Sequence, residues 1–160
     1  MQNKRQQGFS LIELLIVVAI IGIIAAIAIP NLLASRRAAN ESSAIGTLST
    51  IRSAEATYQS TTGNGLFGDK TALFQQGLID NNVNGASSPT ALKSGYFYGV
   101  TLPAPPAGGA AGTIYLATAT AGSTSTGSRA FALDNYGVIV SFGASTTAPG
   151  STAGGSAVGN

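Results

Sequence analysis

Residues 9–30, FSLIELLIVVAIIGIIAAIAIP, form the stretch of sequence that decides the fold. From Leu14 to Ile29 there are 16 successive residues without a polar side chain. A helix over residues 9–29 spans roughly 31 Å at about 1.5 Å per residue, which matches the hydrocarbon core of a bilayer. Apolar side chains surround the helix axis, unlike the one-sided stripe of a surface helix. We predict a helix that lies in lipid or in a protein core built from several such helices.

The composition excludes most kinds of catalytic site. Charged residues make up 9% of the 160 residues, whereas an ordinary soluble domain has roughly 25%. The chain has no His and no Cys, which excludes a Ser-His-Asp triad, a Cys nucleophile, the common zinc sites and any disulfide. Its six carboxylates are not clustered along the sequence. We therefore expect no enzymatic activity, no metal and no cofactor.

Glu13 is the one acidic residue inside the apolar block. A cleaved secretory signal has an apolar region of about 7–15 residues, which is shorter than this block. A plain signal anchor fits the length but does not account for the acid. A carboxylate near the middle of a bilayer costs about 2.5–3.5 kcal/mol. Two interpretations stay open: Glu13 lies at the membrane face, where its side chain reaches water, or it meets a cation on another chain.

The run GFSLIE at residues 8–13 follows a short basic leader and precedes the apolar block that ends at Pro30. This combination resembles the prepilin signature of type IV pilins and pseudopilins, and a leader this short looks like that of the type IVa major pilins. The resemblance implies cleavage between Gly8 and Phe9 by a membrane aspartyl peptidase, followed by methylation of the new Phe9 amine. It also implies that Glu13 pairs with the Phe9 amine of a neighbouring subunit during assembly.

The resemblance implies a structural subunit that polymerises into a type IV pilus, with possible roles in motility, adhesion or DNA uptake. Its implied partners are copies of itself in a helical filament, the prepilin peptidase and methyltransferase, an assembly platform with ATPases, and an outer-membrane secretin. The implied location is the inner membrane, single-pass with a cytoplasmic N-terminus, before assembly, and the extracellular pilus afterwards.

Two alternatives remain. The chain could be a minor pilin or a type II secretion pseudopilin, which share the N-terminal signature. It could also be a membrane-anchored binding module whose head recognises DNA, a surface or a sugar. For nucleic acid, the chain after residue 60 offers only Lys70, Lys93 and Arg129, which do not form a basic stripe.

Gly22 and Pro30 are candidate points of flexibility in the helix. Pro30 cannot donate a hydrogen bond to the carbonyl of Ala26 and crowds it, so the helix is expected to kink there. Gly22 adds a weak point earlier. The simpler interpretation is that Pro30 is a proline that the membrane helix tolerates and that Gly22 only allows close packing. In the resembled family the segment between the matching residues can extend in the filament, so we expect the same of residues 22–30.

The pattern beyond Pro30 predicts an α+β fold, in which the C-terminal half of a long helix packs on an antiparallel sheet of three or four strands, the pilin fold. The helical face is set by apolar residues spaced three or four apart: Ala44, Leu48, Ile51, Ala54 and Tyr58. Strands are expected at 96–102, 113–120, 129–133 and 137–142. The expected segments are a leader (1–8), an apolar helix (9–30), an amphipathic continuation (31–60), a loop (61–94) with a short helix near 71–78, a sheet (95–142) and a flexible tail (143–160).

Three further expectations concern the charged residues and the tail. Arg36, Arg37 and Glu41 just beyond the apolar block either form a solvated face or make salt bridges between subunits. With no Cys, the loop after the last hairpin must be held by other contacts or left mobile. Asp134 and Asn135 supply too few oxygens for calcium, which prefers six to eight.

Overall fold

The computed structural model describes residues 8–104, 110–143 and 145–158. The chain divides into two compact units, one that ends at Ser35 and one that begins at Arg36, which we call the head. Helix α1 (Leu11–Ser60) contributes to both units. Of the expected leader, only Gly8 belongs to the described residues.

Helix α1 begins with one of the two hydrogen bonds of a capping box. The backbone N–H of Ser10 donates to Glu13 Oε2 at 2.9 Å, and the N–H of Leu14 donates to the carbonyl of Ser10. A Ser followed three residues later by Glu satisfies backbone donors that a helix start leaves unpaired. The helix continues through Gly22 and Pro30. The predicted extension of residues 22–30 concerns the packed filament, so it stays a prediction.

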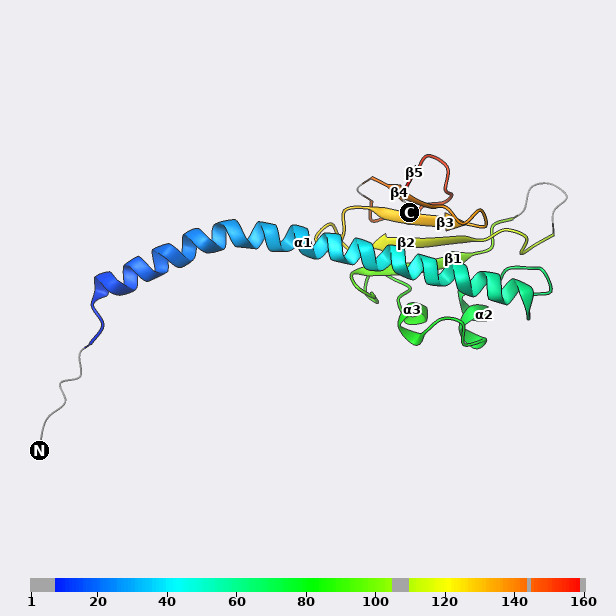
Figure 1. Cartoon of the computed structure of the whole chain (residues 1–160), viewed down its shortest axis with the longest axis horizontal. Helices are drawn as coiled ribbons and strands as arrows, with labels where there is room; N and C mark the ends of the chain where they lie inside the picture. The colour runs from blue at the N-terminus through cyan, green and yellow to red at the C-terminus, as the bar shows by residue number, and fades with distance from the viewer. Residues whose placement is uncertain (1–7, 105–109, 144, 159–160) are drawn as a thin grey trace, which may run out of the picture. The chain divides into compact units, whose positions relative to one another are not determined.

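The head contains an antiparallel sheet whose strands follow one another in space as they do in the sequence. Its strands are β1 (Tyr96–Thr101), β2 (Leu116–Ala121), β3 (Ala130–Asp134), β4 (Ile139–Phe142) and β5 (Ser156–Ala157). Figure 1 shows the C-terminal half of α1 running along this sheet, with α2 and α3 below the helix in this view. The predicted α+β class and helix-on-sheet arrangement are confirmed.

The core of the head lies between α1 and one face of the sheet. Four residues of the predicted helical face are buried, and Tyr58 packs against them. The large partners on the sheet are Tyr96, Tyr98, Phe131 and Leu133, which are fully buried. The small side chains Ala117, Ala119 and Ala121 of the central strand β2 belong to the same cluster. A second, smaller cluster on other positions of the sheet contains Leu116, Ala132 and Val140.

Two short helices occupy part of the segment expected to be a loop. Helix α2 (Lys70–Gln75) lies close to the expected short helix, and helix α3 (Asn81–Gly85) was not expected. Each begins after an aspartate whose side chain accepts a backbone hydrogen bond three residues on, at 2.7 Å. Such caps stabilise short helices. The sequence NNVNG of α3 has poor helix propensity, which is why its composition indicated a loop.

Part of the segment expected to be a flexible tail makes specific contacts with the head. β5 pairs with β4, and the N–H of Val158 donates to the carbonyl of Ile139 at 2.8 Å. The Thr152 hydroxyl also donates to Asp134 Oδ2 at 2.7 Å. The composition of the tail could not predict these contacts. The pairing with β4 uses backbone groups, which any sequence that reaches the edge of that strand can supply. Residues 144 and 159–160 of the expected tail lie outside the described residues.

Candidate functional site

The expected processing site lies in an accessible segment before α1. Gly8, Phe9 and Ser10 precede the helix and are exposed, and the Phe9 side chain keeps 86% of its surface accessible. A Cβ added at Gly8 would meet none of the described atoms within 4 Å. A protease requires an accessible, non-helical backbone, and the Gly8–Phe9 bond provides one.

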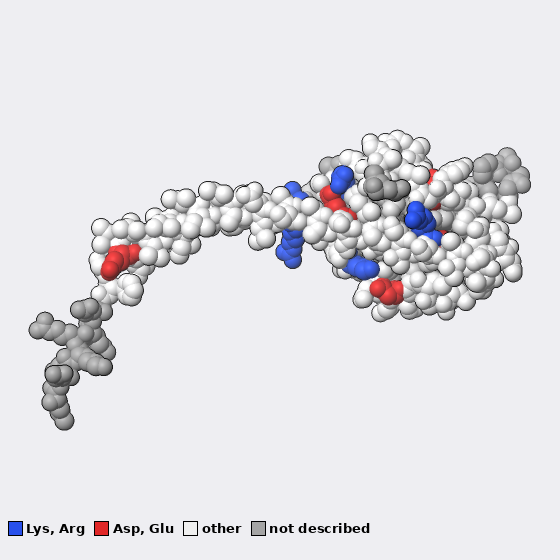
Figure 2. Space-filling view, viewed as in Figure 1, with Lys and Arg blue, Asp and Glu red and all other residues white. Residues whose placement is uncertain are grey.

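The apolar block has no partner within the described chain. Its large apolar residues from Leu11 to Ile29 are between 51% and 81% exposed. Figure 2 shows this part of the helix as an uncharged surface with one acidic patch near its start. The helix is long and apolar enough to cross a membrane. Contiguous apolar patches of this extent mark contact with lipid or with other proteins.

Glu13 is the acidic group in this block, and its observed partner is local. Its Oε2 accepts the Ser10 N–H of the capping box. Sequence analysis missed this role, although the Ser-x-x-Glu spacing is a recognisable signal. One neutral donor leaves the carboxylate with acceptor capacity for a further cation, because a carboxylate has about four lone-pair sites.

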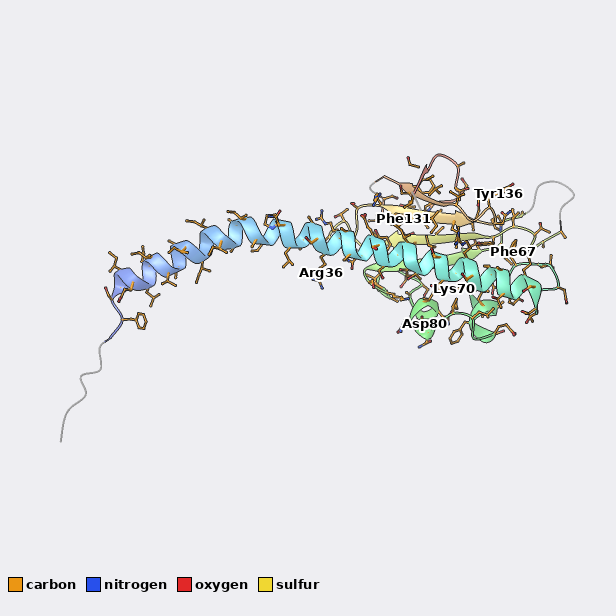
Figure 3. The ribbon with its side chains drawn as sticks, in the orientation of Figure 1. Arg36, Phe67, Lys70, Asp80, Phe131 and Tyr136 are labelled. Carbon is orange, nitrogen blue, oxygen red and sulfur yellow. The ribbon has the colours of Figure 1, made fainter. Side chains whose placement is uncertain are left out.

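Glu41 has its partners within the head. Its Oε2 accepts from Arg129 Nη2 at 2.8 Å and Nε at 3.0 Å. Its Oε1 accepts from the hydroxyl of Ser128 at 2.7 Å and from the Ser128 N–H at 3.0 Å. The expected solvated face is therefore wrong for Glu41, whose side chain is 9% exposed and whose salt bridge is made within the head. Arg36 is exposed and lies where the helix enters the head (Figure 3).

Opposing effects set the pKa of Glu41. Burial favours the neutral acid and by itself raises the pKa. The hydrogen bonds from Ser128 and Arg129 and the positive guanidinium favour the carboxylate, and together they hold the pKa below its usual value. The Arg129 guanidinium also lies 5.4 Å from the centre of the Phe131 ring. Glu41 is thus a charged anchor between α1 and the segment that leads into β3.

The three cations after residue 60 have partners within the head. Arg129 is paired with Glu41, and Lys70 Nζ donates to the carbonyl of Tyr98 at 3.1 Å. Lys93 lies 4.0 Å from Asp80 and donates to Thr47 Oγ1 at 3.4 Å. These contacts are distributed over the head, and Lys93 and Arg129 remain partly exposed, with 29% and 46% of their side-chain surface accessible.

Asp134 has a structural role. Its Oδ1 accepts the Tyr136 N–H at 2.9 Å within the β3–β4 turn, and its Oδ2 accepts the Thr152 hydroxyl. Within the described ranges, no group of three His, Cys, Asp or Glu side chains could hold a metal ion. The carboxylate instead joins the turn to the C-terminal segment.

An accessible Gly8–Phe9 bond, an exposed apolar helix and a head packed on a sheet are the features that the resemblance to pilins led us to expect. Residues 3–29 match the model of the prokaryotic N-terminal methylation motif. The chain is 41% identical to the type IV wide pilus major component PilA4 of Thermus thermophilus over 81 residues, 51% of this chain and 61% of that protein. It is 48% identical to the type IV major pilin protein PilA of Myxococcus xanthus over 56 residues, 35% of this chain and 26% of that protein.

A third relative comes from a secretion system. The type II secretion system core protein G of Aeromonas hydrophila is 30% identical over 97 residues, 59% of this chain and 64% of that protein. The chain therefore spans less than two thirds of the length of each of these relatives. No solved structure matches the chain. These matches confirm the resemblance to type IV pilins and pseudopilins.

Proposed function

We propose that the chain is a structural subunit that polymerises into a type IV pilus through the first half of α1. The observation that carries this proposal is the exposure of the apolar block, whose large apolar residues from Leu11 to Ile29 keep 51–81% of their surface accessible while the head completes a core of its own. Exposing this surface to water would cost about 25 cal/mol per Å², so it has to be covered by lipid before assembly and by other subunits afterwards. Copies of the same helix supply a matching apolar surface, as a homo-oligomeric filament requires.

Processing prepares the subunit for assembly. The prepilin peptidase cuts between Gly8 and Phe9 and the new Phe9 amine is methylated, which the match to the methylation motif supports. Cleavage converts the amide nitrogen of Phe9 into a cation. Glu13 of a neighbouring subunit then pairs with that cation, because two opposite charges in an apolar core are tolerated only together. The Ser10 N–H leaves Glu13 free to make this second contact.

The remaining parts of the proposal concern location and partners. The precursor lies in the inner membrane with its N-terminus in the cytoplasm, and the assembled filament is extracellular. An assembly platform with its ATPases and an outer-membrane secretin act as partners. Residues 22–30, between Gly22 and Pro30, extend when the helix packs in the filament. The proposed role is structural, in keeping with the names of the relatives, which denote a pilus component, a pilin and a secretion-system core protein.

Cryo-electron microscopy of sheared filaments, combined with mass spectrometry of the subunit N-terminus, tests the proposal. The expected result is a filament with the apolar halves of α1 at its centre and a methylated Phe9 as its first residue. A chain that retains residues 1–8 in filaments would contradict the processing step. An unbroken helix over residues 22–30 in the filament would contradict the proposed extension alone.

A pseudopilin of a secretion system is the second candidate, favoured by the similarity to the core protein G of Aeromonas hydrophila. The two candidates differ in where the chain accumulates. A major pilin is abundant in long filaments sheared from the cell surface, whereas a pseudopilin remains in the cell envelope. Quantitative proteomics of the sheared fraction and of the membrane fraction separates them.

A further inference from the structure

Glu55 is a buried carboxyl on the face of α1 that packs in the head. Its side chain has no accessible surface, although Glu is almost never fully buried without a charged partner. Oε2 accepts the N–H of Gly68 at 3.0 Å. Oε1 is buried without a hydrogen-bond partner among the described residues. The site thus provides one donor for a group that needs several when it is ionised.

The charged groups around Glu55 do not compensate a negative charge. Asp69, which follows the Gly68 donor, adds a second negative charge. The two ion pairs found in the described parts of the chain are Arg129 with Glu41 and Lys93 with Asp80. Neither pair includes Glu55.

The neighbouring cations are bound to carbonyl groups. Arg52, one turn earlier on α1, donates to the carbonyl of Gly137 at 3.0 Å, and Lys70 of α2 donates to that of Tyr98. Tyr115, which precedes β2, also faces this site, and its own phenol pKa is raised to about 12, chiefly by burial and further by Glu55 and Asp134. Burial is the main cause that raises the pKa of Glu55 to about 7, against the opposing hydrogen bond from Gly68.

The donor to Glu55 belongs to residues 61–69, which we call the helix-end loop. Its Phe67 ring packs on that of Tyr115 with centres 4.8 Å apart, near the end of α1 (Figure 3), and the N–H of Phe67 donates to the carbonyl of Gly112 at 2.8 Å. Gly63 and Gly68 lie so close to the Tyr58 ring that an added Cβ would be within about 3 Å of it. The loop is therefore closely fitted, and Glu55 is the ionisable side chain of α1 that binds it.

We propose that Glu55 is a proton-dependent latch, which holds the helix-end loop against α1 while its carboxyl is protonated and releases the loop when the carboxyl ionises. The ionised form would leave one oxygen charged, buried and unpaired, which costs several kcal/mol. Opening the loop admits water to that oxygen. The strand pairs of the sheet include no residue of this loop, although Phe67 packs against the same core cluster as Leu48 and Ile51, so we expect the opening to be local.

Amide hydrogen exchange, followed by mass spectrometry on the full chain in detergent micelles, tests the latch. Exchange is measured at about pH 5.5 and about pH 8.5 and corrected for the intrinsic effect of pH on exchange. Peptides covering residues 61–69 and 112–115 are expected to exchange about tenfold faster or more at the higher pH, because opening is coupled to loss of one proton. Peptides from β2 and β3 should show no comparable change.

Two variants and one independent measurement complete the test. Glu55→Gln keeps the size of the side chain without its titration and should remove the pH-dependent step, whereas Glu41→Gln should retain it. In the unmodified chain, infrared spectroscopy should show a protonated buried carboxyl band that disappears with a midpoint near pH 7. An equal pH step in Glu55→Gln would overturn the proposal, as would the absence of that band at pH 5.5.

Discussion

The Arg129 guanidinium donates two hydrogen bonds to one oxygen of Glu41, at 2.8 and 3.0 Å, and so joins α1 to the start of β3. The two residues are 88 positions apart in the sequence. The other Glu41 oxygen accepts two donors from Ser128, so the carboxylate is fully engaged. This anchor is a charged, doubly bonded link between the helix and the segment before β3, and hydrogen bonds between charged groups are stronger than neutral ones.

Arg129→Met should destabilise the head by about 1–3 kcal/mol, because it leaves the buried Glu41 carboxylate with Ser128 as its partner. The Arg129 side chain is 46% exposed, so solvent screens the pair and the loss of stability should lie at the lower end of this range. Urea unfolding of the full chain in detergent, followed by the near-ultraviolet circular dichroism of the buried Tyr96 and Tyr98, measures it. Arg36→Met, at an exposed position of α1, is the matched control and should leave the midpoint unchanged.

The Glu41 contribution should depend on pH in a defined direction. Its pKa in the folded chain lies below the unfolded value of 4.5, so its stabilisation is present above pH 4.5 and is lost as the pH falls through the folded pKa. The difference in unfolding free energy between the unmodified chain and Arg129→Met should therefore shrink under acidic conditions. A difference that grows on acidification would contradict the assignment.

Glu55 should contribute a pH dependence opposite to that of Glu41, and Glu55→Gln should remove it. The pKa of Glu55 rises from 4.5 to about 7 on folding, so its stabilising effect is complete below pH 4.5 and is lost as the pH rises to about 7. This rise corresponds to at most about 3 kcal/mol, and opening of the helix-end loop reduces it. Compared with the unmodified chain, the variant should lose less stability between pH 4.5 and 8 in the same unfolding experiment. Parallel pH profiles of the two chains would refute this prediction.

Glu13→Val should leave the chain in the membrane but abolish or greatly reduce filaments, because the Phe9 amine of a neighbour would lack its counter-charge. Immunoblots of the membrane and sheared fractions measure both outcomes. Glu13→Gln is the informative second variant, since its side-chain oxygen can still accept the Ser10 N–H of the capping box but carries no charge. Normal filaments from Glu13→Gln would show that the hydrogen bond, rather than charge pairing, is the role of this residue.

Thr152→Val should loosen the C-terminal segment, because it removes the hydroxyl that donates to Asp134. We expect a local loss of about 1 kcal/mol, seen as faster limited proteolysis near residues 150–157 with the rest of the head intact. Thr146→Val makes the same chemical change at an exposed position of the same segment and serves as control. Equal cleavage rates in the two variants would argue against a role for the Asp134 contact in a chain that lacks disulfides.

Much of the fold could be predicted because its signals are local. The spacing of Ala44, Leu48, Ile51 and Ala54 repeats with the period of a helix, and all four are buried against the sheet. The apolar strands lie within a few residues of their expected positions. Helix α3 and strand β5 were missed, since one depends on a single capping aspartate and the other on the edge of β4.

In the candidate site, too, the local features could be predicted from the sequence and the tertiary contacts could not. The GFSLIE run at residues 8–13 and the apolar block are continuous in sequence, so their chemistry follows from composition and order, and residues 3–29 carry the matching motif. The partners of Glu41 and Glu55 could not be predicted, because a charge's neighbour and its exclusion from water depend on which distant segments pack around it. The sequence by itself determined an apolar helix with one acid and a head on its second half. The tertiary structure alone decided that Glu41 is a paired anion, at Arg129, and that Glu55 is an unpaired buried acid, since burial and pairing are properties of the packed chain.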